Sequence, residues 1–189
     1  MSKNNYTVAR KSIWYVMRAL IIVLLVVFLA YAGFSASMYI SNMYILATEG
    51  MQLRAECILQ DAAVAEMSAY FSEDFINGDA ALTAGTYSSF TITDFNYNIT
   101  IDNVRVLPFA STGRMRVTER VTNLSGTFND ETVDPVPALT PWQAAQYDIV
   151  FKKTDGRWFI DAIELVQLDP EPKVKGTPDL SLLSEPTDG

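Results

Sequence analysis

The feature that most limits the fold is a stretch of 30 residues without any charge. From Ala19 to Thr48 the chain has no acidic or basic side chain, and residues 19–40 are mostly aliphatic. As an α-helix, residues 19–40 would be about 33 Å long, enough to cross a hydrocarbon core of about 30 Å. The sequence therefore predicts a membrane-spanning helix at 19–40, with apolar character to about residue 47, and a lipid bilayer as its partner.

The charges on the two sides of this stretch differ in sign. Four of the 14 basic residues lie in segment 1–18, before the first acidic residue, Glu49, so residues 1–48 carry a charge of +4. The remaining 10 basic residues face all 22 acidic ones, a net charge of −12. Because basic residues stay on the cytoplasmic side, we predict a single-pass cell-membrane protein with a cytoplasmic N-terminus and an external domain. So acidic a domain repels phosphate, which excludes nucleic acid as a partner.

A cleaved signal peptide is the alternative to an anchor. Ala30-Tyr31-Ala32 has the A-x-A form of a cleavage site. The apolar character continues to Leu46, however, which is longer than the apolar core of most signal peptides and favours an uncleaved helix. Cys57 is the single cysteine, so an intrachain disulfide is impossible, and we interpret it as a small buried apolar residue.

Helices are expected after the membrane segment. Apolar residues recur at spacings of three and four, which places them on one stripe of an amphipathic helix that packs on the domain's own sheet. The stripe consists of Met51, Ala55, Ile58, Ala62, Ala65 and Ala69. Arg54 is among the polar residues on the other faces, and Asn77-Gly78-Asp79 is a breaker of the kind found beyond the end of a helix.

The apolar pattern then changes to a period of two, which predicts half-buried strands. The clearest alternation comprises Phe95, Tyr97, Ile99 and Ile101. A second strand is expected at 104–109, a third around 114–121, and a final pair on either side of Asp155-Gly156, a dipeptide that favours a tight hairpin turn. Residues 123–141 are predicted to form a long polar loop.

These elements predict an α+β fold, with helices covering one face of a curved antiparallel sheet. The basic segment 1–18 and the membrane helix precede one extracytoplasmic domain at 48–168. Residues 169–189 contain four prolines and no periodic apolar pattern, which predicts a flexible tail.

The end of the domain carries a resemblance to a known family. Asp155, Gly156, Trp158 and Ile160 form a D-G-x-W-x-I pattern, and AEMSAYFSEDFINGD precedes the predicted strands. Over residues 48–168 this resembles the nuclear-transport-factor-2-like superfamily, which implies a cone-like sheet wrapped around helices. The superfamily includes isomerases, dehydratases, ligand binders and pure interaction domains, so the resemblance does not decide function. The layout is similar to that of bitopic scaffold subunits of type IV secretion and conjugation channels.

The absence of histidine excludes several chemistries. Ser-His-Asp and Cys-His nucleophilic sites cannot form, nor can metal sites with histidine ligands. One cysteine cannot build a thiolate zinc site, and no glycine-rich phosphate loop is present. We therefore expect neither a metal nor a cofactor.

Carboxylate acid–base chemistry in a cavity survives these exclusions. Glu119 shares strand parity with Met115 and Val117, so it is a candidate for a buried general base; a bulge, an edge position, or an ion pair with Arg105 or Arg120 are the alternatives. Asp161 is a second candidate, unless it faces water at a strand end. Aromatic residues that could line a ligand pocket, or simply pack in the core, are Tyr97, Trp142, Tyr147 and Trp158.

The first functional hypothesis is a non-enzymatic, membrane-anchored domain that binds other proteins of a bacterial cell envelope or a second copy of itself. A secretion or conjugation channel is its most specific form. The second is a ligand-binding or isomerase-like pocket domain that uses a cavity carboxylate. The third is an accessory or sensory envelope domain.

Overall fold

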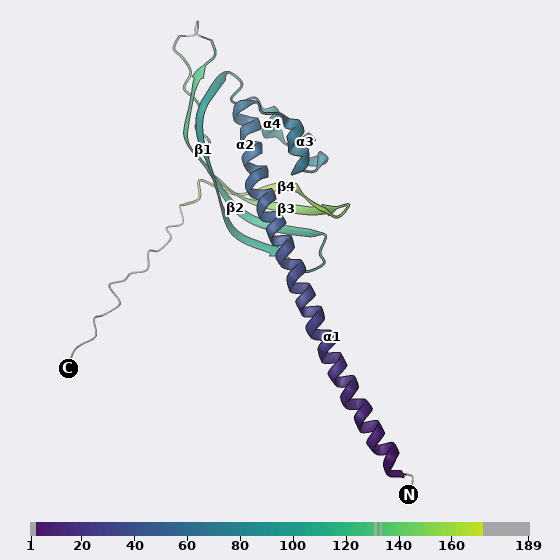
Figure 1. Ribbon diagram of the computed structural model, residues 1–189. Coiled ribbons are helices and arrows are strands. Elements are labelled where there is room, and N and C mark those ends of the chain that lie inside the picture. Colours follow the sequence, from purple (N-terminus) through teal and green to yellow (C-terminus); the bar gives the residue numbers. More distant parts are fainter. Residues whose placement is uncertain (1–2, 131, 133, 172–189) are drawn as a thin grey trace, which may run out of the picture.

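The computed structural model describes residues 3–130, 132 and 134–171. It confirms an α+β chain with a long apolar N-terminal helix and a four-stranded antiparallel sheet. Figure 1 shows this helix extending away from a domain in which shorter helices lie against a curved sheet. Most of the predicted tail, residues 172–189, lies outside the described residues.

The membrane helix and the first helix of the domain are one continuous element. Helix α1 (Lys3–Ile45) passes directly into a π-helical turn, η1 (Leu46–Gly50), and then into α2 (Met51–Gln60). Among the described residues, this continuous helix is the one that is long and apolar enough to cross a membrane, which is consistent with single-pass anchoring. Residues 14–31 are exposed along it. Met43 and Ala47 are fully buried, so the core of the domain begins before residue 48.

The helical layer is more broken than the apolar stripe predicts. Helix α2 ends at Gln60, because Asp61 adopts a left-handed conformation with φ of 56°. The prediction of one helix through Ala69 is therefore wrong in its second half. Residues there form a separate 3₁₀-helix, η2 (Val64–Ala69), whose buried apolar residue is Met67 rather than the alanines of the stripe.

Two short capped helices complete this layer. Helix α3 (Glu73–Gly78) begins after Ser72, whose hydroxyl oxygen accepts a hydrogen bond from the backbone N–H of Phe75. Asp79 ends α3 and caps α4 (Ala80–Thr83) by accepting from the N–H of Ala81. The predicted breaker at residues 77–79 is thus confirmed, and its aspartate begins the next helix.

The sheet has the order β1-β2-β3-β4 with antiparallel neighbours. Its strands are β1 (Phe90–Val106), β2 (Thr112–Phe128), β3 (Ala145–Thr154) and β4 (Arg157–Leu168). Asp155 and Gly156 connect the last two, both with positive φ, as a two-residue hairpin turn requires. The predicted closing hairpin is confirmed.

Strands predicted separately at 95–101 and 104–109 are in fact one strand, β1. Its register with β2 shifts between Ile101 and Asn103. This bulge moves the core-facing positions from odd numbers, such as Ile99, to even numbers, such as Val104 and Val106. The change in parity therefore marks a bulge and not a break between strands.

Strand β2 extends further than the sequence predicts. The expected loop at 123–141 begins as strand, and β2 continues to Phe128 opposite Phe90. Gly126 lies so close to β1 that an added Cβ would be 2.8 Å from the carbonyl oxygen of Thr91. Only glycine fits this approach, which explains why a residue typical of loops lies within a strand.

The helices cover one face of the sheet, and the core lies between the two layers. Side chains from α1 and α2 meet those of the three C-terminal strands. The most deeply buried large residues include Met43, Met51, Phe71, Met115, Ile149, Phe151 and Ile160. Cys57 is a free, buried cysteine in this core, as predicted.

Candidate functional site

Strand β2 carries a carboxylate on the covered face of the sheet. Glu119 follows Met115 and Val117 at intervals of two, so the three side chains point toward the helices. Glu119 is 1% exposed. Because β2 is an inner strand with regular pairing to Ile99 of β1 and Ala145 of β3 at this position, the predicted alternatives of a bulge or an edge position are wrong.

Three of the predicted pocket residues interact with this carboxylate. The hydroxyl of Tyr97, on β1, donates a hydrogen bond of 3.1 Å to Oε2 of Glu119. The hydroxyl of Tyr147 on β3 also stabilises the charged carboxylate, as does the indole of Trp142. Neither gives Oε1 a hydrogen bond of normal geometry, so this oxygen has no partner among the described residues. Tyr97, Trp142 and Tyr147 therefore surround Glu119.

A buried ion pair lies beside this group. The guanidinium of Arg54, on α2, donates to both carboxylate oxygens of Asp79 at 2.6 and 3.1 Å. The two side chains are only 10% and 9% exposed. The positive charge of the Arg54 guanidinium also acts on Glu119, where it favours the charged carboxylate and so opposes the effect of burial on the pKa. We call Arg54, Asp79, Tyr97, Glu119 and Tyr147 the buried polar cluster.

Burial dominates the electrostatics of the cluster. It raises the pKa of Glu119 above its ordinary value, because the charged form loses its water, and Arg54 and Tyr97 offset only part of this effect. Burial and the neighbouring Glu119 also raise the pKa of Tyr97, and they raise the pKa of Tyr147 to about 12. Burial alone would lower the pKa of Arg54, but the hydrogen bonds that Arg54 donates to Asp79 and the negative charge of that carboxylate outweigh it and raise that pKa.

The other candidates lie elsewhere. Asp161 is a half-buried residue in a bulge of β4, where Val150 pairs with Ala162 and the next residue, Phe151, pairs with Ile160. That point on β3 is five to six residues from Ala145, the partner of Glu119, which is about 17–20 Å along the strand. The structure does not bring Asp161 together with the buried polar cluster.

Trp158 is also separate from the cluster. It packs against Tyr39 of α1, with ring centroids 5.2 Å apart, and Nζ of Lys153 lies 4.7 Å from the centre of the Tyr39 ring. Trp158 thus joins the β3–β4 hairpin to the membrane helix, a packing role that the sequence offered as its alternative. The pocket set therefore divides into three residues around Glu119 and one at the helix.

Sequence reasoning missed the ion pair. It placed Arg54 on the polar, solvated side of the helix, and it treated Asp79 only as part of a breaker. Their separation of 25 residues leaves no local pattern to connect them. A signal existed only in part, since an aspartate directly before a helix is a recognised N-terminal cap, the position that Asp79 has before α4.

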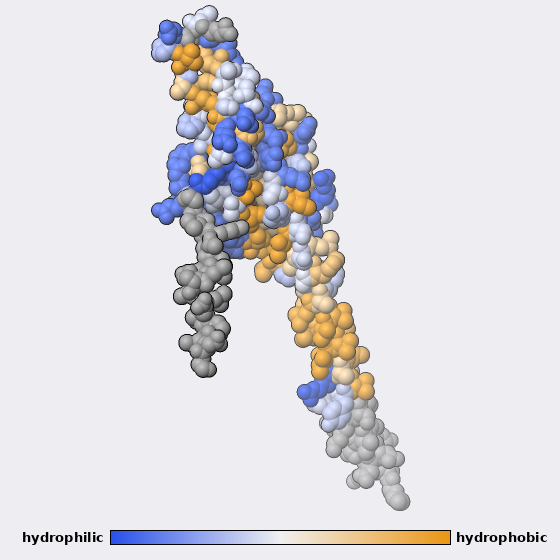
Figure 2. Space-filling view, turned by 60° about the vertical axis from the view of Figure 1, so that its left-hand side comes forward, coloured by the Kyte–Doolittle hydropathy of each residue, from blue (hydrophilic) through white to orange (hydrophobic). Residues whose placement is uncertain are grey.

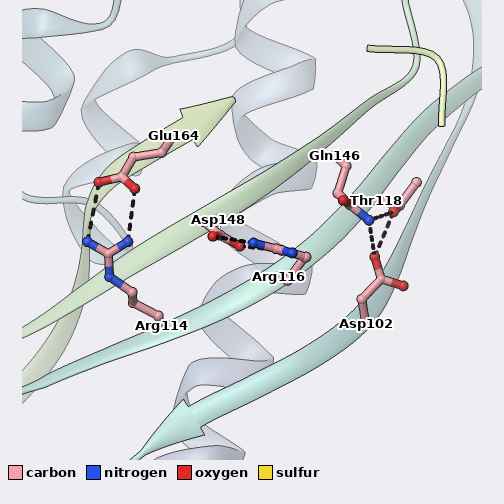
Figure 3. A network of polar contacts seen from close by, with 7 residues as sticks. All are labelled: Asp102, Arg114, Arg116, Thr118, Gln146, Asp148 and Glu164. Carbon is pink, nitrogen blue, oxygen red and sulfur yellow. Dashed lines mark hydrogen bonds and ion pairs between the residues drawn. The ribbon is translucent and has the colours of Figure 1, made fainter. Parts of the chain in front are cut away.

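The opposite face of the sheet is polar. Figure 3 shows three groups of side chains across its strands. Arg116 binds Asp148 through two hydrogen bonds of 2.7 Å, and Arg114 pairs with Glu164. In the third group, Asp102 accepts hydrogen bonds from Thr118 and Gln146. This network explains why the alternate residues of β2 are arginine and threonine, since their face is turned to water.

Clusters of metal ligands and surface grooves are two further features typical of active sites. Within the described part of the chain, no three acidic or sulfur-bearing side chains converge where they could hold a metal ion. A groove of about 570 Å³ lies beside the β1–β2 turn, lined by residues such as Arg105, Leu107 and Arg114. A smaller one lies beside Trp158 at the β3–β4 turn. Glu119 lines neither groove.

Comparison of the chain with protein-family models, curated proteins and solved structures finds no match. The resemblance to the nuclear-transport-factor-2-like superfamily therefore stays a prediction. Assignment of function depends on the geometry alone.

That geometry limits the chemistry of the cluster. A carboxyl group with a raised pKa beside a tyrosine hydroxyl has the components of a general acid or base. Proton transfer also requires a substrate within hydrogen-bond reach. Glu119 is enclosed by three strands and α2, and its bonded oxygen already accepts from Tyr97. In the described conformation, the cluster links the helical layer to the sheet through the electrostatic interaction between Arg54 and Glu119.

Proposed function

We propose that this chain is a single-pass, membrane-anchored protein-interaction subunit of a bacterial cell-envelope assembly, most specifically a secretion or conjugation channel. The observation that carries the proposal is the continuity of the membrane helix with the core. Met43, Ala47 and Met51 lie on one unbroken helical path and are at most 1% exposed. A pocket domain functions equally well on a flexible tether, whereas a scaffold must hold its partners at a fixed height and angle to the membrane.

The proposal includes a fold and an orientation. Helices on one face of a curved four-stranded sheet support a cone-like arrangement of the nuclear-transport-factor-2-like type (Figure 1). The basic residues in segment 1–18 support a cytoplasmic N-terminus with the domain on the outer side. An anchored domain also has a high effective concentration toward other proteins of the same membrane.

Sheet surface opposite the helices is the proposed contact region. Strand β1 is an edge strand of 17 residues, with no strand beside its outer edge in the described part of the chain. An open edge can pair with an extended segment of a partner. The polar network next to it keeps this face soluble when no partner is bound.

Photocrosslinking in intact membranes tests the proposal. A photoreactive amino acid at Thr100, exposed on β1, should form adducts with other envelope proteins in the organism's own membranes. The same group at Thr83, exposed on the helical side, is the matched control and should give fewer adducts. Recovery of only the chain itself from Thr100 would contradict the scaffold proposal.

A pocket function is the second candidate, supported by the unpaired Oε1 of the buried Glu119. If this carboxylate acts on a ligand, Glu119→Gln should abolish complementation of a deletion strain while the near-ultraviolet circular dichroism of the domain stays unchanged. Asp161→Asn is the matched control, because Asp161 lies far from the cluster. Full complementation by Glu119→Gln would reject the pocket and is the result expected of a scaffold.

A further inference from the structure

We propose that the turn between β1 and β2 enters the leaflet of the bilayer on the domain's side. Residues Leu107–Phe109 would then form a second membrane contact beside α1, and the domain would rest on the membrane in one fixed orientation. The inference concerns placement in the bilayer and does not depend on which proteins the domain binds.

The first observation is a ring contact between the turn and the membrane helix. The Phe109 ring lies 5.6 Å from the ring of Tyr31 and 6.0 Å from that of Phe28, measured between centroids. In Figure 1 the turn lies at the end of the domain that adjoins α1. The start of β2 also packs closely on α1, because a Cβ added at Gly113 would be 2.2 Å from the Cε atom of Met43. The hairpin therefore follows α1 toward its N-terminus.

The second observation is the depth of that contact. A hydrocarbon core of about 30 Å takes about 20 helical residues. If the core begins at Trp14, it extends to about residue 33; if it begins after Arg18, it extends to about residue 38. Phe28 and Tyr31 are inside both ranges. At a rise of about 1.5 Å per residue, the level of Tyr31 is roughly 3 to 10 Å below the edge of the core.

The third observation is the surface of the turn. Leu107, at 74%, has the highest exposed fraction among the large apolar residues that the structure describes, and Phe109 next to it in the turn is 50% exposed. Figure 2 shows apolar residues at the end of the domain next to the apolar band of α1. Exposure of this apolar surface to water is unfavourable, whereas its burial in the hydrocarbon of a leaflet is favourable.

Charged residues lie where the headgroups would be. Arg105 on β1 and Arg114 on β2 are exposed and lie opposite each other across the two strands. Arg105 is two residues before Leu107, or about 7 Å from it along the strand. Arg114 pairs with Glu164, while Arg105 forms no ion pair with the described residues. Guanidinium groups bind phosphate well. In a chain whose residues after Thr48 carry a charge of −12, two arginines at this level suit contact with lipid phosphate.

Spin labelling of the full-length chain tests the placement. Cys57→Ala removes the native thiol, and single cysteines at Leu107, Val23 and Asp155 then carry a nitroxide. The protein is reconstituted in vesicles of phosphatidylethanolamine and phosphatidylglycerol. The Leu107 label should be accessible to oxygen and shielded from a water-soluble nickel chelate, like the Val23 label in the membrane helix. The Asp155 label, at the exposed turn of the other hairpin, should show the reverse.

Each other outcome overturns the proposal. A Leu107 label as accessible to nickel as the Asp155 label would place the turn in water. Shielding from both reagents, with spin–spin broadening, would show that a second copy covers the turn. A Val23 label exposed to nickel would show that α1 itself is not inserted. Phe109→Asp provides a second measurement and should raise nickel access at Leu107 severalfold.

Discussion

Arg54→Met should lower the free energy of unfolding by about 3–5 kcal/mol, the cost of removing one partner of a buried ion pair. The Asp79 side chain, 9% exposed, would be left in the core without its bidentate partner. Methionine preserves most of the apolar stem of the arginine, so the change isolates the loss of the guanidinium. The measurement is urea unfolding of the full-length protein in detergent, followed by the fluorescence of Trp142 and Trp158.

The exposed ion pair on the other sheet face is the matched control. Arg114 and Glu164 have side chains that are 55% and 51% exposed, so Arg114→Met should cost less than about 1 kcal/mol. The double variant Arg54→Met/Asp79→Asn should regain much of the loss, because no unpaired charge is left in the core. Equal costs for the two arginine variants would contradict the importance of burial.

The stability of the fold should depend on pH through the buried carboxyl group of Glu119. Burial raises the pKa of Glu119 in the folded protein above the ordinary value of 4.5. The folded state therefore keeps this proton at pH values where the unfolded chain has lost it. The contribution of Glu119 to the free energy of unfolding should therefore be largest near or below pH 4.5 and should fall as pH rises toward the folded pKa.

The composition makes this effect measurable. With no histidine in the chain, no side chain has an ordinary pKa between about 5 and 8. In that window the wild-type protein should lose stability with rising pH, while Glu119→Gln should have an almost constant free energy of unfolding and be the more stable form at pH 8. Glu164→Gln, at an exposed carboxylate, should keep the wild-type slope. A slope that persists in Glu119→Gln would show that another group titrates.

Much of the sheet could be predicted because its signals are local. Alternation over residues 95–101 and the Asp155-Gly156 pair each determine a strand or a turn within a few residues. Glu119 could be placed on the buried face for the same reason, since β2 itself is regular from Gly113 to Thr122 and the neighbouring bulge lies in β1.

Non-local contacts account for the failures. The bulge that moves Asp161 is a register shift between two strands, which no single strand records in its own sequence. The sequence pattern placed Arg54 on a solvated face because its partner, Asp79, lies 25 residues later in the chain. The helices η2 and α3 separate the two residues in sequence. The extension of β2 to Phe128 depends on the contact of Gly126 with Thr91, more than 30 residues earlier.

The continuity of α1 with the core has a practical consequence for any soluble form of the domain. A fragment that begins at residue 48, where the charges return, would lack Met43 and Ala47, both fully buried. It would leave Gly113 uncovered and remove Tyr39 from the ring of Trp158. A truncation that keeps the native packing must begin near Ser35, and it would expose to water about the last one to two turns of the predicted membrane helix.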